Sequence, residues 1–437
     1  MRDVSTYFRL EGGTLFVGRY NFEDRVQHFG YLFEDSVRLR ARNDVPMAVS
    51  LSGGVDSASV YGACARLHRK GDLRCASNTL ENKDFRTCSV IYPGCRVNEQ
   101  PWIEACLKKW NGQDSYMPVT PNAEVLPSEL SDIVWFQEAP VWSPAIFSLH
   151  SLYRRISEAG IRVVLEGHGA DEMLGGYPRL VKTALGELTA TSRLSDAVTA
   201  FHCLIGMHSV PGSIISFSKL RGVGLAFGDL GSILRQSFTN QTAGGQKARN
   251  RNNKRQFFSQ EILANREGQN SMPESGQYDF NYALRREFTE TTLPFFLRVF
   301  DRATMAYGVE SCPPFLDHRL VQFAFALPMT DKVGHLSKRI LREAGRDWLP
   351  VSVRNRRGKT PFTAPVEAWF NSSTVWEYLW DTFNCEDALS SSFINARNVI
   401  HYIEAKKRSR FTYWDVQRLW PALNLYLWDR IVCRPSR

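Results

Sequence analysis

Residues 52–57 read Ser-Gly-Gly-Val-Asp-Ser, and this stretch decides the fold that we expect for the chain. It follows a short apolar run at residues 45–51, which is typical of a buried parallel strand. It precedes residues 58–69, in which apolar side chains recur at helical spacing. A strand, a glycine turn and a helix in this order point backbone N–H groups at one spot, which predicts an anion site.

The composition of this loop indicates which anion it binds. Gly53 and Gly54 let the backbone approach a phosphate closely, and Ser52 and Ser57 add hydroxyl donors. The stretch lacks the lysine of the common Walker loop and carries Asp56 instead. An acid beside a phosphate indicates a divalent cation between the two. The alternative is a glycine turn that only tightens a strand–helix corner.

Three later segments indicate which kind of phosphate loop residues 52–57 form. Residues 161–165 read as a second buried strand and run into EGHGADEMLGGY at residues 166–177. Residues 301–317 read DRATMAYGVESCPPFLD, and residues 357–362 read RGKTPF. In this order the segments resemble the synthetase domain of the asparagine synthetase family. The usual motifs of that family are SGG-x-DS, GEGADE before GGY, a DR…PFLD segment and R-x-K-x-GF. This family has a phosphate loop of the ATP pyrophosphatase type.

The predicted fold is α/β. Strands near residues 47–51, 86–92, 114–119 and 161–165 alternate with helices near 57–69, 100–110 and 144–159. This alternation predicts a doubly wound parallel sheet, which the resemblance makes adenine-nucleotide hydrolase-like, with a helical C-terminal part. Both glycine turns follow strands, so both should lie at the carboxyl edge of the sheet and face one crevice.

We expect three segments along the chain. Residues 1–44 form a lead-in region with a helix at 20–44, and residues 45–180 form the nucleotide-binding core. Residues 181–437 form a helical substrate or closing region, which ends in a helix at 413–428. The candidate core positions of the lead-in helix are Phe29, Leu32, Phe33, Val37 and Leu39.

Composition agrees with a large enzyme that works in the cytoplasm. The 437 residues are 43% hydrophobic, yet no apolar run is long enough to span a membrane. The N-terminus lacks the apolar stretch of a signal peptide, and the nine cysteines are scattered without a C-x-x-C pair.

The formal net charge of +9 raises the question of a nucleic-acid partner. The densest basic cluster lies within residues 240–277, a stretch rich in Asn, Gln and Gly that we interpret as a mobile basic insert. It lacks interleaved aromatic residues for base stacking, so we expect no nucleic acid, with a docking arm for a polyanion or carrier protein as the alternative.

The resemblance implies a substrate, a metal and roles for individual residues. ATP is the nucleotide substrate, and Asp56 and Asp171 hold Mg²⁺. Lys359 neutralises charge as the tetrahedral adduct forms, Lys338 is placed to reach phosphate, and His168 takes a proton from the nucleophile. The residues expected to bind ATP or pyrophosphate are Leu51, Ser52, Gly53, Gly54, Asp56, Ser57, Val90, Gly94 and Gly167. The structural alternatives are a helix-capping Asp171, a surface Lys359 and a His168 that only stabilises its turn.

This sequence departs from the usual family motifs at two places, and both bear on the identity of the substrate. His168 stands where the family usually has the glutamate that takes a proton from ammonia. A histidine can also act as a base near neutral pH, but it lacks the charge of a carboxylate. Residues 312–314 read Cys-Pro-Pro where relatives usually read Arg-Val-Pro, so a guanidinium near the substrate is absent.

Glutamine-dependent members of the family begin with a cysteine nucleophile, whereas Arg2 stands in that place here. We therefore expect that this chain does not hydrolyse glutamine by the family route. The nitrogen donor would be ammonia, ammonia from a separate glutaminase subunit, or an amine of the substrate.

Three functions remain open. The leading one is an ATP-dependent ligase that adenylates a small-molecule or peptide carboxylate, with aspartate plus ammonia as the first candidate, and releases AMP and pyrophosphate. The second is a lactam or lasso-peptide macrolactam cyclase, for which a peptide-binding subunit is a further possible partner. The third is a non-catalytic subunit that binds nucleotide.

Overall fold

The computed structural model describes residues 20–73, 85–141, 143–208, 256–259, 279–358 and 364–434. The chain divides into two compact units. The first consists of residues 1–120, 151–210 and 273–360, and the second consists of residues 121–150, 211–272 and 361–437. The division that the sequence suggested, at residues 44 and 180, stays a prediction.

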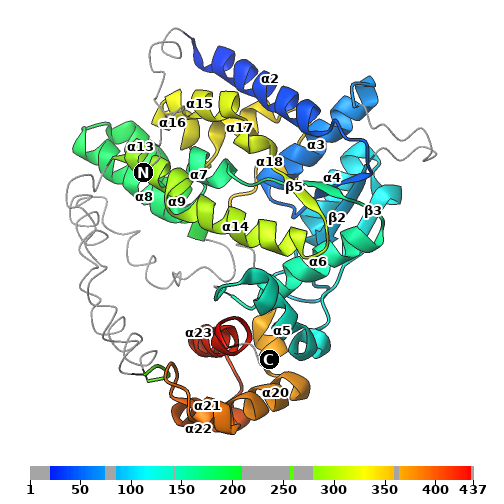
Figure 1. Cartoon of the computed structure of the whole chain (residues 1–437). Coiled ribbons are helices and arrows are strands. Elements are labelled where there is room, and N and C mark those ends of the chain that lie inside the picture. Colours follow the sequence, from blue (N-terminus) through cyan, green and yellow to red (C-terminus); the bar gives the residue numbers. More distant parts are fainter. Residues whose placement is uncertain are drawn as a thin grey trace, which may run out of the picture. The chain divides into compact units, whose positions relative to one another are not determined.

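The described residues of the first unit contain a five-stranded parallel sheet with the order β3-β2-β1-β4-β5 (Figure 1). The central strand β1 (Met47–Ser50) pairs with β2 (Arg86–Val90) on one side and with β4 (Val163–Leu165) on the other. The outer strands are β3 (Tyr116–Val119) and β5 (Glu310–Cys312). This sheet confirms the predicted α/β fold, and the first four strands match the predicted ones.

One strand contradicts the prediction that the chain is helical after residue 180. β5 pairs with β4 in parallel register, with Ser311 opposite Val164. Its three residues are Glu, Ser and Cys, so neither apolar alternation nor β-branched side chains mark it in the sequence. The pairing with β4 makes it a strand.

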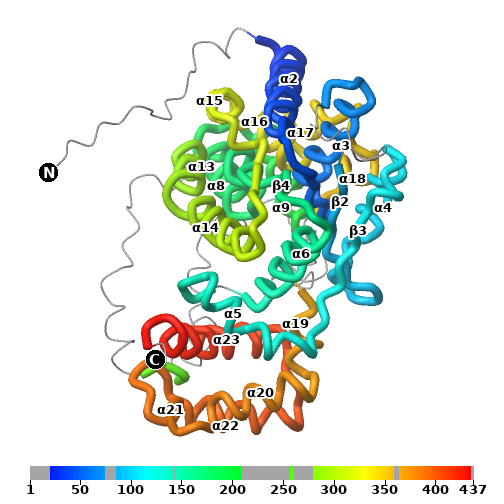
Figure 2. Tube along the Cα trace, turned by 45° about the vertical axis from the view of Figure 1, so that its right-hand side comes forward, coloured from blue at the N-terminus to red at the C-terminus, as the bar shows by residue number. Residues whose placement is uncertain are grey.

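Helices cover both faces of the sheet. α3 (Val55–Lys70) follows β1, α4 (Gln100–Trp110) follows β2, and α6 (Ile146–Glu158) precedes β4; α6 belongs to this unit from Ser151 onward. Figure 2 shows α4 and α6 on opposite sides of the strands, as right-handed crossovers require. The other helices in the described part of the first unit are α2 (Phe22–Arg40), η1 (Gln113–Ser115), α7 (Ala170–Leu174), α8 (Pro178–Ala190), α9 (Leu194–His208), α13 (Phe280–Thr289), α14 (Thr292–Met305), η5 (Pro314–Leu316), α15 (His318–Ala326), α16 (Met329–Lys332), α17 (Arg339–Ala344) and α18 (Val351–Arg354).

The lead-in helix α2 begins where its sequence provides a cap. The side chain of Asn21 accepts from the Asp24 backbone N–H, and Asp24 accepts in return from the Asn21 backbone. Phe29 and Phe33 are fully buried, and the ring of Phe33 stacks on Phe315 with centroids 4.6 Å apart. Of the predicted core positions Leu39 alone is only partly buried.

The second unit is helical in its described part. Its elements are η2 (Ala123–Val125), α5 (Leu126–Gln137), the first part of α6, α19 (Val366–Phe370), α20 (Ser373–Phe383), α21 (Glu386–Leu389), α22 (Ala396–Ser409), α23 (Tyr413–Trp428) and the π-helix η6 (Asp429–Cys433). α23 is the helix predicted at residues 413–428, whereas α5 was not predicted. The basic insert lies outside the described residues except for 256–259, where Phe257 is buried against Tyr402.

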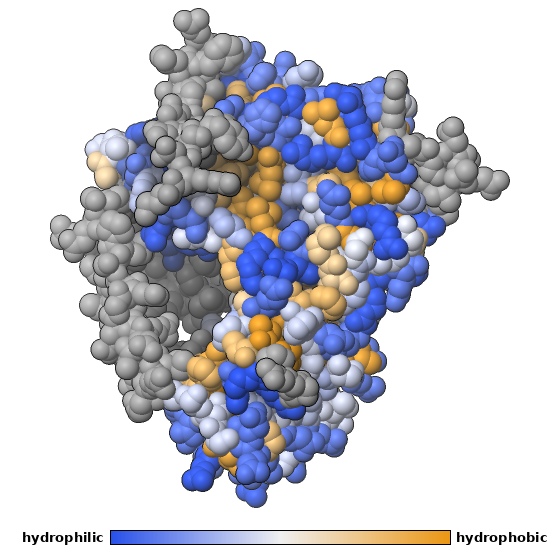
Figure 3. Space-filling view, in the orientation of Figure 1, coloured by the Kyte–Doolittle hydropathy of each residue, from blue (hydrophilic) through white to orange (hydrophobic). Residues whose placement is uncertain are grey.

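The described surface is mainly hydrophilic on the face seen in Figure 3, where apolar residues form separate patches. Among the described residues, no helix has the length and apolar character needed to cross a bilayer.

Candidate active site

Hydrogen bonds between Ser52 and Ser57 stabilise the loop between β1 and α3. The Ser52 backbone N–H donates to the Ser57 hydroxyl oxygen at 3.0 Å, and the two hydroxyl oxygens also lie 3.0 Å apart. Gly53 has φ +73°, and a Cβ there would lie 3.0 Å from the Cβ of Trp102. Glycine is therefore required at this position, and the first turn of α3 begins directly after the loop at Val55.

The second glycine turn lies against the first. A Cβ at Gly167 would come within 2.9 Å of both the Asp56 Cβ and the Ser57 backbone nitrogen. Only glycine allows the two turns to approach so closely. The structure therefore brings the two turns together at the carboxyl edge of the sheet, as their positions after β1 and β4 predicted.

Asp56 and Asp171 converge on one ammonium group. The Lys338 Nζ donates to Asp56 Oδ1 at 2.7 Å and Oδ2 at 2.6 Å, and it lies 2.5 Å from Asp171 Oδ1. Lys338 is 2% exposed, so this charged cluster is shielded from solvent. Lys338 precedes α17 with φ +59°, a left-handed conformation that is strained for a lysine.

The Asp56 and Asp171 carboxylates can supply some, but not all, of the oxygen ligands of a magnesium ion. They already share one cation, the Lys338 ammonium, and carboxylate oxygens are the ligands that Mg²⁺ prefers. Within the described ranges no group of three or more His, Cys, Asp or Glu side chains is suited to a metal. Asp56 and Asp171 would therefore hold the ion together with phosphate oxygens and water.

Sequence analysis did not identify Glu166, which directly precedes Gly167. Its carboxylate accepts from the Tyr153 hydroxyl at 2.7 Å and from the Ser311 hydroxyl at 2.5 Å, and its Oε2 lies 3.2 Å from His168 Nε2. Burial raises the pKa of the Glu166 carboxyl, but the neighbouring His168 and the hydrogen bonds from Ser311 and Tyr153 outweigh it, so the pKa is lowered. Glu166 is therefore an ionised, buried carboxylate beside the predicted base His168.

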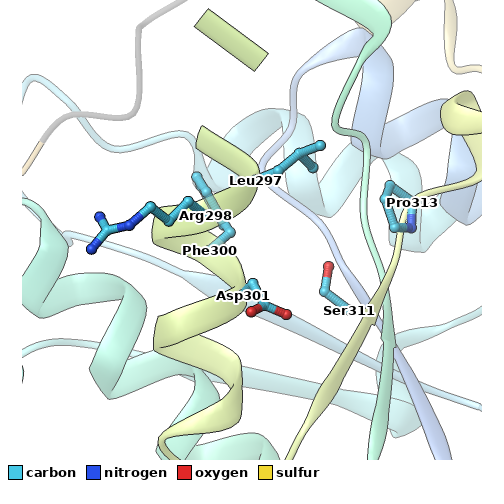
Figure 4. Close-up of a pocket in the computed structure, with 6 residues that line it drawn as sticks. All are labelled: Leu297, Arg298, Phe300, Asp301, Ser311 and Pro313. Atoms are coloured by element: carbon cyan, nitrogen blue, oxygen red, sulfur yellow. The ribbon is translucent and has the colours of Figure 1, made fainter. Parts of the chain in front are cut away.

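A pocket of about 330 Å³ adjoins this network (Figure 4). Ser311 lines the pocket and also donates to Glu166, and Phe300 lines it and packs against His168 with ring centroids 4.1 Å apart. In Figure 4 the carboxylate of Asp301 points toward Ser311, while the guanidinium of Arg298 points away. The remaining lining residues are Leu297 and Pro313.

Two arginines that the sequence did not single out support the phosphate loop and the charged cluster. Arg356 donates to the Gly53 carbonyl at 3.1 Å and to Glu99 Oε1 at 2.6 Å, and its guanidinium lies 3.9 Å from the ring centroid of Trp102. Burial lowers the pKa of Arg342 to about 10, while Asp56 opposes that shift. Arg342 therefore adds positive charge near the aspartates.

Four predicted site residues remain, namely Leu51, Val90, Gly94 and Lys359. Leu51 extends the sheet, because its backbone N–H donates to the Cys88 carbonyl at 2.8 Å. Val90 ends β2, and Gly94 has φ +76° with open space where a side chain would begin. Lys359 lies outside the described residues. The roles of these residues in binding ATP stay predictions.

Comparison with known proteins agrees with this geometry. The family model described as asparagine synthase matches residues 28–430, which is most of the chain. Amidase chry2 of Gibberella zeae is 25% identical over 77% of this chain and 51% of its own length. Amidase chyE of Penicillium rubens is 26% identical over 79% of this chain and 53% of its own length.

A bacterial relative covers more of the chain. The glutamine-hydrolysing asparagine synthetase 1 of Bacillus subtilis is 23% identical over 91% of this chain and 58% of its own length. The chain thus spans a little over half the length of these curated relatives. Because the family model covers the phosphate loop, the second glycine turn and the charged cluster, the chain belongs to the asparagine synthase family.

Proposed function

We propose that this chain is an ATP-dependent ligase that adenylates a carboxylate, releases pyrophosphate and then forms an amide with release of AMP. Aspartate with ammonia as nitrogen donor is the first candidate pair of substrates. One observation carries the proposal: Asp56 and Asp171, from two different glycine turns, meet at one buried cation beside a phosphate loop that has no lysine of its own.

Each part of the site has a role in this reaction. Ser52, Gly53, Gly54 and Ser57 bind the departing pyrophosphate at the start of α3. Lys338 supplies positive charge to the phosphates. Magnesium, held by Asp56 and Asp171, neutralises phosphate charge when bound.

The remaining predicted residues complete the proposal. Lys359 stabilises the charge of the tetrahedral adduct, and Val90 and Gly94 contact the adenine. His168 accepts the proton of the attacking nitrogen. We further propose a cytoplasmic location and either a separate glutaminase or a peptide-binding subunit as partner.

The pocket favours a second candidate, in which the nucleophile is an amine carried by the substrate. A cavity of about 10–15 Å³ is already enough to hold a water molecule, and ammonia is of similar size. The pocket of 330 Å³ beside His168 is far larger and suits an organic group. A lactam or macrolactam cyclase would use it for the substrate segment that carries the amine.

The test is to identify the nucleotide product. The chain is incubated with ATP, magnesium chloride and a panel of carboxylates, each with ammonium chloride or with a tethered amine. We expect AMP and pyrophosphate; ADP as the main product would refute the ligase. Absence of any carboxylate-dependent AMP or pyrophosphate exchange, together with tight ATP binding, would favour the non-catalytic subunit.

A further inference from the structure

Glu166 and His168 flank the glycine at which the two turns touch. Gly167 lies against Asp56 and Ser57 of the phosphate-loop region, so its neighbours on both sides are fixed next to that loop. A carboxylate and an imidazole are thereby held within hydrogen-bonding distance, with His168 Nε2 3.2 Å from Glu166 Oε2. The position suits proton transfer during the second half of the reaction.

Glu166 is poorly placed to touch a substrate itself. Its side chain is 4% exposed, and both of its oxygens already accept hydrogen bonds, from Tyr153, Ser311 and His168. The side chain of His168 is 19% exposed, and its ring packs on Phe300 in the pocket wall. The imidazole is therefore the member of the pair that a nucleophile can reach.

We propose that Glu166 is a positioning residue that orients His168 to deprotonate the nitrogen nucleophile, an ammonium ion or a primary amine in its cationic form, that enters from the Ser311–Asp301 pocket. The inference rests on the proposed function, because it assigns the base for the amide-forming step. Asp301 suits the amine in its cationic form before attack, since its carboxylate points into the same pocket as Ser311 (Figure 4).

The hydrogen-bonding pattern determines which nitrogen is the base. Glu166 is ionised and can only accept, so the Nε2–H of His168 donates to it and the lone pair lies on Nδ1. The cationic amine first gives one proton to Nδ1, and the nitrogen lone pair so freed attacks the acyl carbon of the adenylate and forms the C–N bond. The C–O bond to AMP breaks with its electron pair on the phosphate oxygen, and the second proton of the nitrogen passes to water. Glu166 then stabilises the imidazolium, as a carboxylate does in hydrolase triads.

The first test separates adenylation from amide formation. Wild type, Glu166→Gln and a surface control, Glu290→Gln, are assayed with ATP, magnesium chloride and L-aspartate. The nucleophile is either ammonium chloride, which must lose a proton, or hydroxylamine, which is largely unprotonated at neutral pH and needs no base. Glu290 is a suitable control because its side chain is 63% exposed and pairs only loosely with Arg286, at 3.9 Å.

In Glu166→Gln we expect amide formation from ammonium to fall at least ~10²-fold, the scale of a lost general base. Hydroxamate formation and pyrophosphate exchange should stay within about tenfold of wild type, because neither needs His168. Glu290→Gln should match wild type throughout. An equal fall of all three rates in Glu166→Gln would overturn the inference, because it would show a structural role.

The second test needs no substrate and uses the wild-type chain. Long-range ¹H–¹⁵N spectra of ¹⁵N-histidine protein report which ring nitrogen carries the proton, and His168→Asn identifies the signal by its loss. We expect neutral His168 to be protonated on Nε2, and protonation on Nδ1 would overturn the inference. If wild type forms no AMP with any carboxylate, the proposed function fails, and this spectrum still decides the pairing of Glu166 with His168.

Discussion

Replacing Gly176 by alanine tests the charged cluster without removing any charge. Gly176 follows α7, and a Cβ there would lie 1.8 Å from Asp171 Oδ1 and 2.5 Å from Lys338 Cε. Real Cβ atoms essentially never come within 3.0 Å of another heavy atom, so the Asp171 carboxylate must move by more than an ångström. The backbone of Gly176 is not left-handed, so the added methyl acts through contact alone.

Two effects of different size follow from this overlap. Overpacking of a tight site costs on the order of 1–3 kcal/mol, so the free energy of unfolding should fall by that amount. Displacement of a reacting group by about 1 Å costs on the order of 10²-fold in rate, so pyrophosphate exchange should fall by at least that factor. The loss of rate should therefore exceed what partial unfolding alone explains.

The assay compares pyrophosphate exchange and urea unfolding for Gly176→Ala and for the control Gly30→Ala. Gly30 lies within α2, and its added Cβ would meet Ala344 at an ordinary 3.6 Å. Alanine is the better helix former, so this control should gain about 0.5–1 kcal/mol in stability and keep wild-type exchange. Wild-type exchange in Gly176→Ala would refute the reasoning, because it would show that the position of Asp171 does not matter for adenylation.

Three further changes test other parts of the site and the fold. Asp56→Asn should lower pyrophosphate exchange at least ~10²-fold without unfolding the chain, and unaltered exchange would make Asp56 only a loop residue. Arg356→Lys keeps the charge but loses the planar group on Trp102 and the paired hydrogen bonds to the Gly53 carbonyl and Glu99, so ATP affinity measured by calorimetry should fall about tenfold. Unchanged affinity would exclude a role in holding the loop. Burial lowers the pKa of Lys332 from 10.5 to about 7, so between these values the unfolded chain binds a proton that the folded chain lacks, and this group makes stability rise with pH. Lys332→Met should therefore be more stable than wild type at pH ~6 and show a smaller rise to pH ~9 in urea titrations, whereas an identical rise would contradict the cause.

The sequence predicted the sheet and both glycine turns because those features are local. An apolar run followed by glycine and a helical pattern identifies β1 with its loop, and the same pattern identifies β4 with residues 166–171. Parallel pairing of β1 with β4 then brings the ends of the two strands together. The meeting of Asp56 with Asp171 follows from that topology.

The residues that the sequence missed depend on contacts between distant segments. Glu166 reads as the polar end of a buried strand, and its partner Ser311 lies 145 residues further along the chain in the unpredicted strand β5. Arg356 reaches Gly53 from 303 residues away. Lys338 was predicted to reach phosphate, and its left-handed backbone and its position between two aspartates have no local signal.

His168 stands where the family usually has a glutamate, so both the identity of the base and the charge of the second turn differ from the family pattern. A neutral imidazole at residue 168 becomes a cation when it accepts a proton, and it carries no negative charge of its own to compensate that cation. The buried carboxylate of Glu166, two residues earlier, supplies that missing negative charge. Its three hydrogen bonds make the carboxylate stable away from solvent, so proton acceptance and charge compensation lie on two side chains. The imidazole is the more exposed member of the pair and packs on Phe300 of the pocket wall, so the part that meets the nucleophile is a planar ring rather than a hydrated carboxylate. That arrangement suits an organic amine better than free ammonia, and it links the unusual residue at position 168 to the size of the pocket beside it.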